Sequence, residues 1–447
     1  MARRPDDDRS LSARARRLAL VVSVALGLAI AAPAASRAAD REESASEILN
    51  GLLESLLGLG EMSALEVQKV VGEAGGVPFT SDVPVQFMTK DALGRYLREL
   101  VDAEYPPSDV EADTRTLIAF DLLEPGTDLG QARLKLLEEN IAGFYDERPD
   151  RRRLYVVSSD AKLTPMNQII LAHELRHALQ DQHASVHGII PKDVGDFDDR
   201  RMAFLSLLEG DATLVMGQFL SRRIQGAELP APDLSDFAFP VSPMPGTPAV
   251  LRDQMVLPYV IGTPFARELR SAGGWDAVRR AWSRPPESTE QVLHPEKFQA
   301  GERPREVAVT YAPASGKLLR EGVLGELFAR TLLGDEAEEE AAAAAAAGWG
   351  GDRFKVWDRS GATLLVWHAT WDTEDDAREF ALALDARFDR THERQSPRGG
   401  ATVFRKASWS VATERRGSDT WLVSSDEPAV FQEALAGLND ATKGGPR

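Results

Sequence analysis

Residues 169–179 of the chain read IILAHELRHAL, and this stretch gives the strongest indication of fold and chemistry in the sequence. Its apolar residues recur at the period of a helix, which we expect over residues 166–182, directly after Pro165. Residues four positions apart share one helix face, so His173 and His177 can direct both imidazoles at a single point. The stretch therefore predicts a helix that carries a two-histidine binding site.

The residue types of this site are typical of a zinc ion, Zn2+. Zinc takes nitrogen and oxygen ligands in tetrahedral geometry, and a catalytic zinc site leaves one position open for water. Glu174 lies one residue round the helix from His173, where its carboxylate can take a proton from that water as a general base. The alternative interpretation is a helix whose histidines only face solvent.

A third protein ligand is expected on the next strong helix, residues 199–222. Within it, residues 203–213 read AFLSLLEGDAT, which places acidic residues directly after an apolar face. A buried carboxylate is costly unless a cation accompanies it, so we assign Glu209 as the third metal ligand. Asp211 is expected to accept a hydrogen bond from a ligand imidazole and orient it. Alternatively, both acids lie on a solvated surface of this helix.

Other residues are candidates for supporting roles. His294, stiffened by the proline that follows it, is a candidate catalytic residue, although it can equally tie its loop to the backbone. Tyr145 and Tyr155 are alternatives for the same role, but tyrosines of a strand more often serve packing. His183 and His187 follow the helix at spacings that allow a fourth ligand.

An HExxH motif with a glutamate on a later helix resembles the glutamate-liganded zincins, the group of metallopeptidases that includes thermolysin. The resemblance implies that His173, His177 and Glu209 hold zinc, that Glu174 is the general base, and that the reaction is peptide hydrolysis. It also implies an edge strand ahead of the helix that pairs with extended substrate, a place that the hairpin expected at residues 141–157 can fill. The segment AHELRHALQDQH, with the later segments EGDA and STEQVLHPEKF, is similar to sequences of uncharacterised exported bacterial proteins with zincin motifs.

The pattern of elements indicates an α+β protein with two folded parts after an N-terminal leader. Residues 39–300 are expected to form a mostly helical, zincin-like core with a β-hairpin edge, and residues 301–447 a smaller α+β domain of unknown role. Polar, proline and glycine residues gather at about 300–316, which we take as the boundary. Helices are expected at 129–140, 264–271, 275–282, 318–333, 336–347, 373–388 and 429–436, and strands at 83–88, 354–357, 363–370, 402–405, 409–413 and 420–423.

The N-terminus predicts export. Three arginines within residues 14–17 precede an apolar run at 18–32 and a small-residue stretch at 34–38, the order of a signal peptide cleaved after residue 38. An uncleaved N-terminal membrane anchor is the alternative. The chain has no cysteine, which excludes disulfides and thiolate metal sites, and its formal net charge of −18 disfavours nucleic acid and anionic membranes as partners.

Taken together, the sequence predicts an exported zinc metallopeptidase that acts on a peptide or protein substrate. Two other classes of function remain open at this point. One is a non-catalytic binding or structural protein that zinc only stabilises, and the other is a zinc hydrolase of non-peptide amides.

Overall fold

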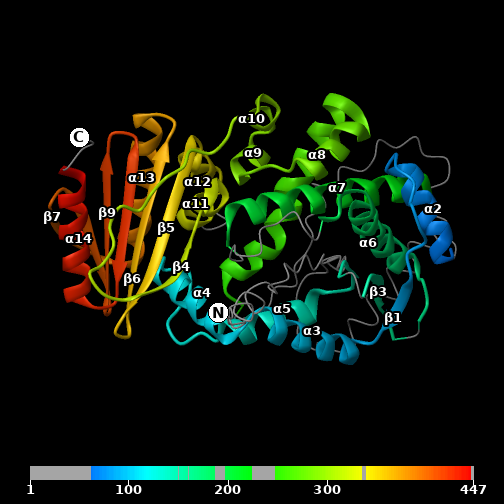
Figure 1. Ribbon diagram of the computed structural model, residues 1–447, viewed down its shortest axis with the longest axis horizontal. Helices are drawn as coiled ribbons and strands as arrows, with labels where there is room; N and C mark the ends of the chain where they lie inside the picture. Colours follow the sequence, from blue (N-terminus) through cyan, green and yellow to red (C-terminus); the bar gives the residue numbers. More distant parts are fainter. Residues whose placement is uncertain are drawn as a thin grey trace, which may run out of the picture.

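The computed structural model describes residues 62–148, 151–159, 161–186, 197–223, 247–334 and 339–443. The expected signal peptide and the alternative N-terminal anchor therefore lie outside the described residues. Over the described ranges the protein is α+β, as the sequence predicts, with two sheets at opposite ends of an elongated molecule and helices between them (Figure 1). None of the described helices combines the length and the apolar character that crossing a membrane requires.

The smaller sheet has three strands, β1 (Val85–Met88), β2 (Gly143–Asp146) and β3 (Arg153–Val157). The expected hairpin is confirmed: β2 and β3 pair antiparallel, and β3 also pairs with β1 in parallel, so the order is β1-β3-β2. This order leaves β2 at an edge. Helices α3 (Lys90–Glu104) and α5 (Leu129–Asn140) lie beside this sheet (Figure 1).

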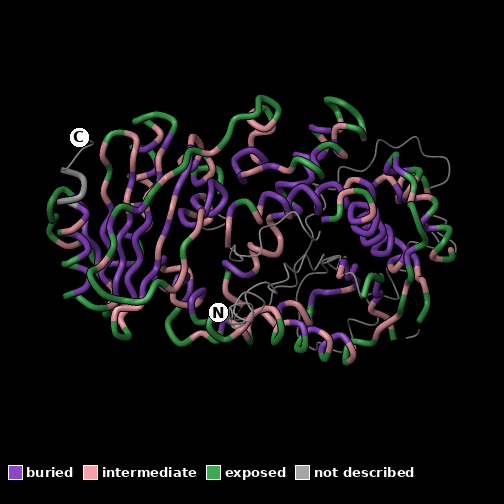
Figure 2. The backbone as a smooth tube through the Cα atoms, viewed as in Figure 1, coloured by how far each residue is buried: buried purple, intermediate pink, exposed green. Residues whose placement is uncertain are grey.

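A helical layer fills the middle of the molecule and contains the predicted binding helix. Helix α6 (Pro165–Ala184) begins where Thr164 accepts a hydrogen bond from the amide of Asn167, with Pro165 in the first turn. Its side chains are buried almost continuously, because α2 (Ala64–Ala74), α7 (Asp199–Arg223) and the small sheet surround it (Figure 2). The expected helices at 166–182 and 199–222 are both confirmed.

Helix α8 (Ala249–Ser283) covers both helices expected at 264–271 and 275–282, but its first part begins at Ala249, well before the predicted start at residue 264. The prolines at 258 and 264 do not end the helix, because apolar residues from Val250 to Leu269 form a buried face that packs along α7. The expected break does occur at Gly273 and Gly274, whose backbone angles are not helical. The short helices α9 (Thr289–Leu293) and α10 (Pro295–Ala300) follow.

The larger sheet has seven antiparallel strands in the order β4-β5-β6-β10-β9-β8-β7. Helices α11 (Gly325–Leu333), α12 (Glu339–Ala346) and α13 (Glu374–Thr391) contribute to the core on one face, and α14 (Pro428–Lys443) to the core on the other. The strands are β4 (Lys317–Gly322), β5 (Trp349–Arg359), β6 (Ala362–Trp371), β7 (Glu393–Arg398), β8 (Ala401–Lys406), β9 (Trp409–Arg416) and β10 (Asp419–Ser425).

Two elements of this sheet differ from the sequence prediction. The single helix expected at 318–333 is wrong, because its first half is strand β4, paired with β5, and only its second half is helix α11. The change of direction is fixed by Asp352, whose carboxylate accepts hydrogen bonds from the amides of Leu324 (2.8 Å) and Gly325 (3.0 Å). The exposed, proline-containing edge strand β7 was not foreseen, since it lacks an apolar pattern.

The two ends of the molecule share part of a core. Phe120, at the end of α4 (Pro107–Ala119), is fully buried and meets Phe328, Phe354 and Trp367 edge-on, with ring centroids 5.2–6.2 Å apart. The seven-stranded sheet thus begins just after the predicted boundary at 300–316, but its core is completed by a residue from the N-terminal half of the chain.

Helices α7 and α8 touch backbone to backbone where they cross. A Cβ atom on Gly210 would lie 2.0 Å from the carbonyl oxygen of Gly262, and one on Gly262 would lie 1.9 Å from that of Ser206. Only residues without side chains permit this approach. Because Gly210 stands between Glu209 and Asp211, the crossing fixes the depth at which both acids enter the core.

We expect Gly262→Ala to lower the free energy of unfolding by about 3 kcal/mol, because the added methyl group meets backbone that cannot rotate away. Urea unfolding measures the change. Gly130→Ala is the matched control, since a Cβ there finds only ordinary contacts at 3.6 Å, and we expect it to leave stability unchanged or raised. Equal stability of the two variants would contradict the close crossing.

Candidate metal centre

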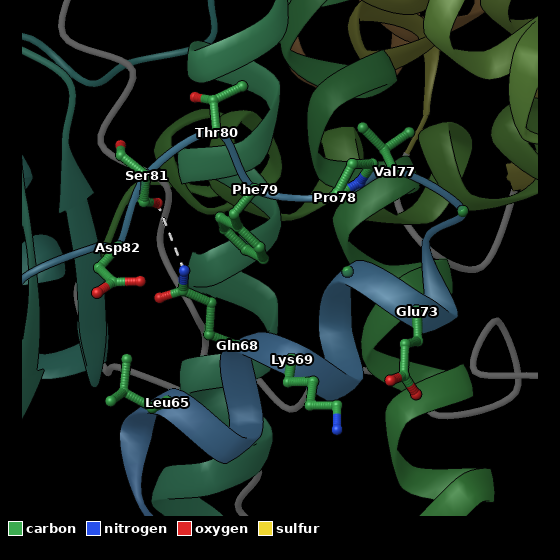
Figure 3. Close-up of a pocket in the computed structure, with 12 residues that line it drawn as sticks. Leu65, Gln68, Lys69, Glu73, Val77, Pro78, Phe79, Thr80, Ser81 and Asp82 are labelled. Atoms are coloured by element: carbon green, nitrogen blue, oxygen red, sulfur yellow. Dashed lines mark hydrogen bonds between the residues drawn. The ribbon is translucent and has the colours of Figure 1, made fainter.

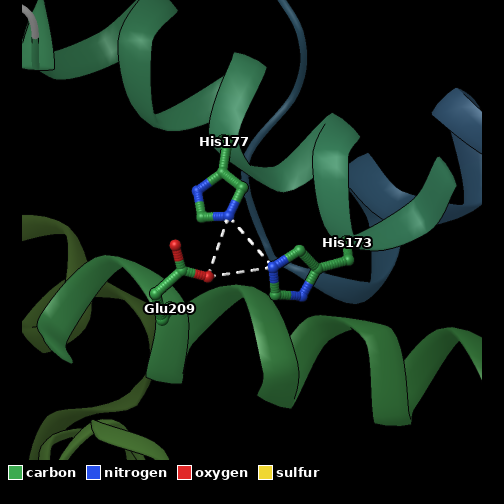
Figure 4. A group of neighbouring side chains, drawn as sticks. All are labelled: His173, His177 and Glu209. Atoms are coloured by element: carbon green, nitrogen blue, oxygen red, sulfur yellow. Dashed lines mark hydrogen bonds and ion pairs between the residues drawn. The ribbon is translucent and has the colours of Figure 1, made fainter. Parts of the chain in front are cut away.

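Two helices bring the three predicted ligands together. His173 and His177 project from α6 and Glu209 from α7, and their donor atoms converge (Figure 4). The Nε2 atoms of the histidines are 3.0 Å apart, and Oε2 of Glu209 lies 3.1 Å from that of His173 and 3.4 Å from that of His177. The structure therefore brings the glutamate predicted on one helix next to the two histidines predicted on the other.

All three side chains are buried, with exposed fractions of 1%, 3% and 3%. The ring of His173 stacks on Tyr259 of α8, with centroids 5.9 Å apart and planes inclined by 26°. This contact restricts rotation of the imidazole and keeps its Nε2 atom directed at the group. Tyr259 was missed from the sequence, because nothing local links it to a helix some eighty residues earlier.

The electrostatics of the group favour a positive charge. Burial alone would raise the pKa of Glu209 and lower that of His177, yet the two opposite charges outweigh burial. The pKa of Glu209 therefore lies below its ordinary value, and that of His177 lies above it. Burial keeps the pKa of His173 below its ordinary value, and the neighbouring His177 lowers it further. Three donors that already stabilise a protonated imidazole would also stabilise a metal cation in its place.

The spacing of the donors fits zinc. For a tetrahedral ion with bonds of about 2.0–2.1 Å, neighbouring ligand atoms are about 3.3 Å apart. The three observed separations of 3.0, 3.1 and 3.4 Å bracket that value. Two imidazole nitrogens and one carboxylate oxygen also form a ligand set typical of catalytic zinc.

A second group of acids does not have this character. Glu290, Glu302 and Asp372 also lie close to one another, but the ammonium group of Lys297 is 2.6, 3.1 and 2.8 Å from their oxygens. A lysine already neutralises these carboxylates, so we interpret the group as an ion-pair network.

Glu174 lies beside the three donors without joining them. It is fully buried, its Oε2 accepts a hydrogen bond from the amide of Tyr145 at 2.9 Å, and its charge helps to raise the pKa of His177. Strand β2 packs closely on α6 at Gly143. A Cβ atom at this position would lie only 2.9 Å from the side chain of Ile170, so the glycine permits the approach. The carboxylate is thus held between the edge strand and the metal centre.

Asp211 corrects one prediction: it does not contact a ligand imidazole. Its carboxylate accepts two hydrogen bonds from Arg176 at 2.9 Å, one from Gln180 at 2.8 Å and one from Trp282 at 3.1 Å. Gln180 in turn lies 2.8 Å from Nδ1 of His177. The expected orienting contact therefore exists through an intermediate residue. Gln180 could have been identified from the sequence, because it follows His177 by three residues and so lies on the same face of the helix.

The structure does not bring His294 into the group. It lies between α9 and α10, and its Nε2 atom is 2.9 Å from a carboxylate oxygen of Glu326 on α11. That contact and the buried carboxylate beside it raise the pKa of His294, as expected of an ion pair between two elements. The contact is structural, but it is made to a side chain of another helix and not to the backbone as the alternative expected.

The remaining candidates also have other partners. His183 donates a hydrogen bond to the carbonyl of Pro78 at 2.9 Å, and the hydroxyl of Tyr145 donates to Asp181 at 3.0 Å. Tyr155 stacks on Phe144, with ring centroids 4.8 Å apart. His187 lies outside the described residues.

A groove of about 650 Å³ lies between α2 and residues 77–82 and contains none of the predicted site residues (Figure 3). Leu65, Lys69 and Phe79 are among the residues that line it. Gln182 and His183 of α6 hold the 77–82 segment by hydrogen bonds. The groove is therefore adjacent to the end of α6 but separate from the three metal-binding candidates.

Comparisons with known proteins bear on the C-terminal part alone. A family model described as a domain of unknown function (DUF8575) matches residues 314–435, which include the seven-stranded sheet. No curated protein and no solved structure matches the chain. The candidate metal centre lies outside the matched residues, so its interpretation depends on its own geometry.

We expect the purified wild-type protein to retain about one zinc ion per chain, and Glu209→Ala to bind zinc more than about tenfold more weakly. Elemental analysis and competition with a chromophoric chelator measure content and affinity. Glu296→Ala, which removes an exposed glutamate, is the control and should match the wild type. Unchanged affinity in Glu209→Ala would move the third ligand elsewhere.

Proposed function

We propose that this chain is an exported, zinc-dependent metallopeptidase that hydrolyses peptide bonds. The observation that carries the proposal is the convergence of His173, His177 and Glu209 at tetrahedral spacing, with the carboxylate of Glu174 beside them. Export is inferred from the signal-like order of residues 14–38.

The residues present divide the chemistry between them. Zinc, when bound, polarises the substrate carbonyl and lowers the pKa of water. His173, His177 and Glu209 would hold the ion, which leaves one tetrahedral position for water or substrate. Glu174 acts as the general base: its carboxylate accepts the proton of the attacking water and passes it to the leaving nitrogen. The amide of Tyr145 orients that carboxylate.

The position of β2 favours an extended peptide as the substrate. Strand β3 pairs with one side of β2, and the amide of Tyr145 points to the other side, where it meets Glu174. A peptide that added to this edge as a further strand would bring its own carbonyl groups next to the general base. A small non-peptide amide would gain nothing from such an edge.

One observation favours a second candidate function, a zinc ion that only stabilises the fold. His173, Glu174, His177 and Glu209 are all less than 4% exposed in the described structure. A metal at this depth would join α6 to α7 whether or not a substrate reached it. The general base distinguishes the two functions, since a stabilising site has no use for Glu174.

We expect Glu174→Gln to lower peptide hydrolysis by at least about 100-fold while zinc content stays the same, because the variant removes the base but no ligand. Hydrolysis of a mixed library of quenched fluorescent peptides measures the effect. Glu73→Gln, an exposed glutamate on α2, is the control and should keep full activity.

Hydrolysis that survives in zinc-loaded Glu174→Gln would overturn the assignment of the base. A wild-type protein that holds zinc and cleaves no peptide would favour the stabilising role. Cleavage confined to non-peptide amides would indicate a zinc hydrolase of non-peptide amides.

A further inference from the structure

Gln180 links the candidate metal centre to the core of the protein. It lies on α6 one turn after His177 and is fully buried. Its amide nitrogen donates to Oδ2 of Asp211 at 2.8 Å and to the carbonyl of Leu208 at 3.0 Å. Its amide oxygen lies 2.8 Å from Nδ1 of His177.

These contacts determine which way the amide faces. The two atoms on its nitrogen side, a carboxylate oxygen and a backbone carbonyl, only accept hydrogen bonds. The nitrogen must therefore face Asp211 and Leu208, and the oxygen must face His177. Because an amide oxygen only accepts, Nδ1 of His177 has to carry a proton.

The tautomer of His177 follows from this. In a neutral imidazole with a proton on Nδ1, the lone pair is on Nε2. Nε2 is the atom that lies 3.0 Å from Nε2 of His173 and 3.4 Å from Oε2 of Glu209. When the ring is neutral, as a metal ligand must be, Gln180 thus leaves the lone pair of His177 on the atom that faces the other two donors.

The amide cannot easily rotate to favour the other tautomer. Rotation by 180° would place its oxygen against the carboxylate of Asp211 and the carbonyl of Leu208, and would leave buried acceptors facing an acceptor. Asp211 is itself held by Arg176 and Trp282. The guanidinium of Arg176 lies over the ring of Trp275, 5.0 Å from its centroid, and over that of Trp282, 4.8 Å from its centroid. The anchor of Gln180 is therefore fixed by three helices.

We propose that Gln180 is a positioning residue that holds His177 in its Nδ1-protonated tautomer and thereby sets the metal affinity of the site. The inference rests on the metal centre of the proposed function but not on peptide hydrolysis. It makes a residue outside the HExxH motif, with no atom on the metal, a determinant of metal retention.

The test compares Gln180→Met with Gln182→Met. Methionine keeps the length and volume of glutamine but removes the amide, so packing between α6 and α7 is largely preserved. Gln182 lies on the same helix and bonds to the 77–82 segment, away from His177, which makes it a matched control. Chelator competition should show zinc affinity about 10–100-fold weaker in Gln180→Met and unchanged in Gln182→Met.

A second measurement reads the tautomer directly in the wild-type protein, and variants serve it only for assignment and comparison. Long-range proton–nitrogen correlation spectra of wild-type protein labelled with ¹⁵N-histidine report the tautomer of each ring. Of the imidazole signals that shift when zinc is added, that of His177, assigned with His177→Gln, should show a protonated Nδ1 and a metal-bound Nε2. In Gln180→Met the Nδ1 proton should exchange faster with solvent.

A metal-bound Nδ1 in His177, or equal zinc affinity in Gln180→Met and the wild type, would overturn the inference. These results differ from failure of the proposed function, in which the wild type holds zinc with the expected tautomer but hydrolyses no peptide. Failure of the wild type to bind zinc would overturn both.

Discussion

The buried ion pair between Arg176 and Asp211 is the interaction on which the rest of the centre depends. Both side chains are fully buried, and two hydrogen bonds of 2.9 Å join them. Removing two charges from water is costly unless each finds a complete set of partners. Here the partners come from three helices: the carbonyl of Gly75 at the end of α2, Gln180 on α6, and two tryptophans on α8. The relative placement of α6, α7 and α8 is therefore specified by charge as well as by packing.

The candidate ligands are arranged around this pair in the sequence itself. Arg176 stands between His173 and His177, and Asp211 stands two residues after Glu209. Helix α6 directs two histidines to the metal centre and α7 one glutamate, and on each helix a near neighbour of these ligands belongs to the ion pair. A shift of either helix that disturbed the ion pair would also separate the donors. The glycine crossing of α7 and α8 adds a steric limit to the same arrangement. The same contacts between α6, α7 and α8 therefore determine both the stability of the fold and the geometry of the three donors.

What the sequence predicts well is local. The period of the apolar residues predicts α6 and α7 within two residues, and the i,i+4 rule predicts that His173 and His177 share a face. Contacts between distant segments are what it misses. Asp211 was expected to meet an imidazole, but whether a carboxylate meets a ligand or a glutamine depends on the angle between two helices. Strand β4 was taken for helix because its residues become a strand only by pairing with β5, more than thirty residues later. Tyr259 reaches His173 only because α8 crosses the centre.

Zinc K-edge X-ray absorption of the zinc-loaded wild-type protein tests the central claim most directly, because it reports the ligands themselves rather than the effect of a substitution. The account predicts a four-coordinate ion with nitrogen and oxygen neighbours at about 2.0–2.1 Å, and with the outer-shell scattering of two imidazole rings. Scattering from one imidazole or none, or a six-coordinate oxygen shell, would show that zinc binds elsewhere and that the convergence of His173, His177 and Glu209 is not a metal centre.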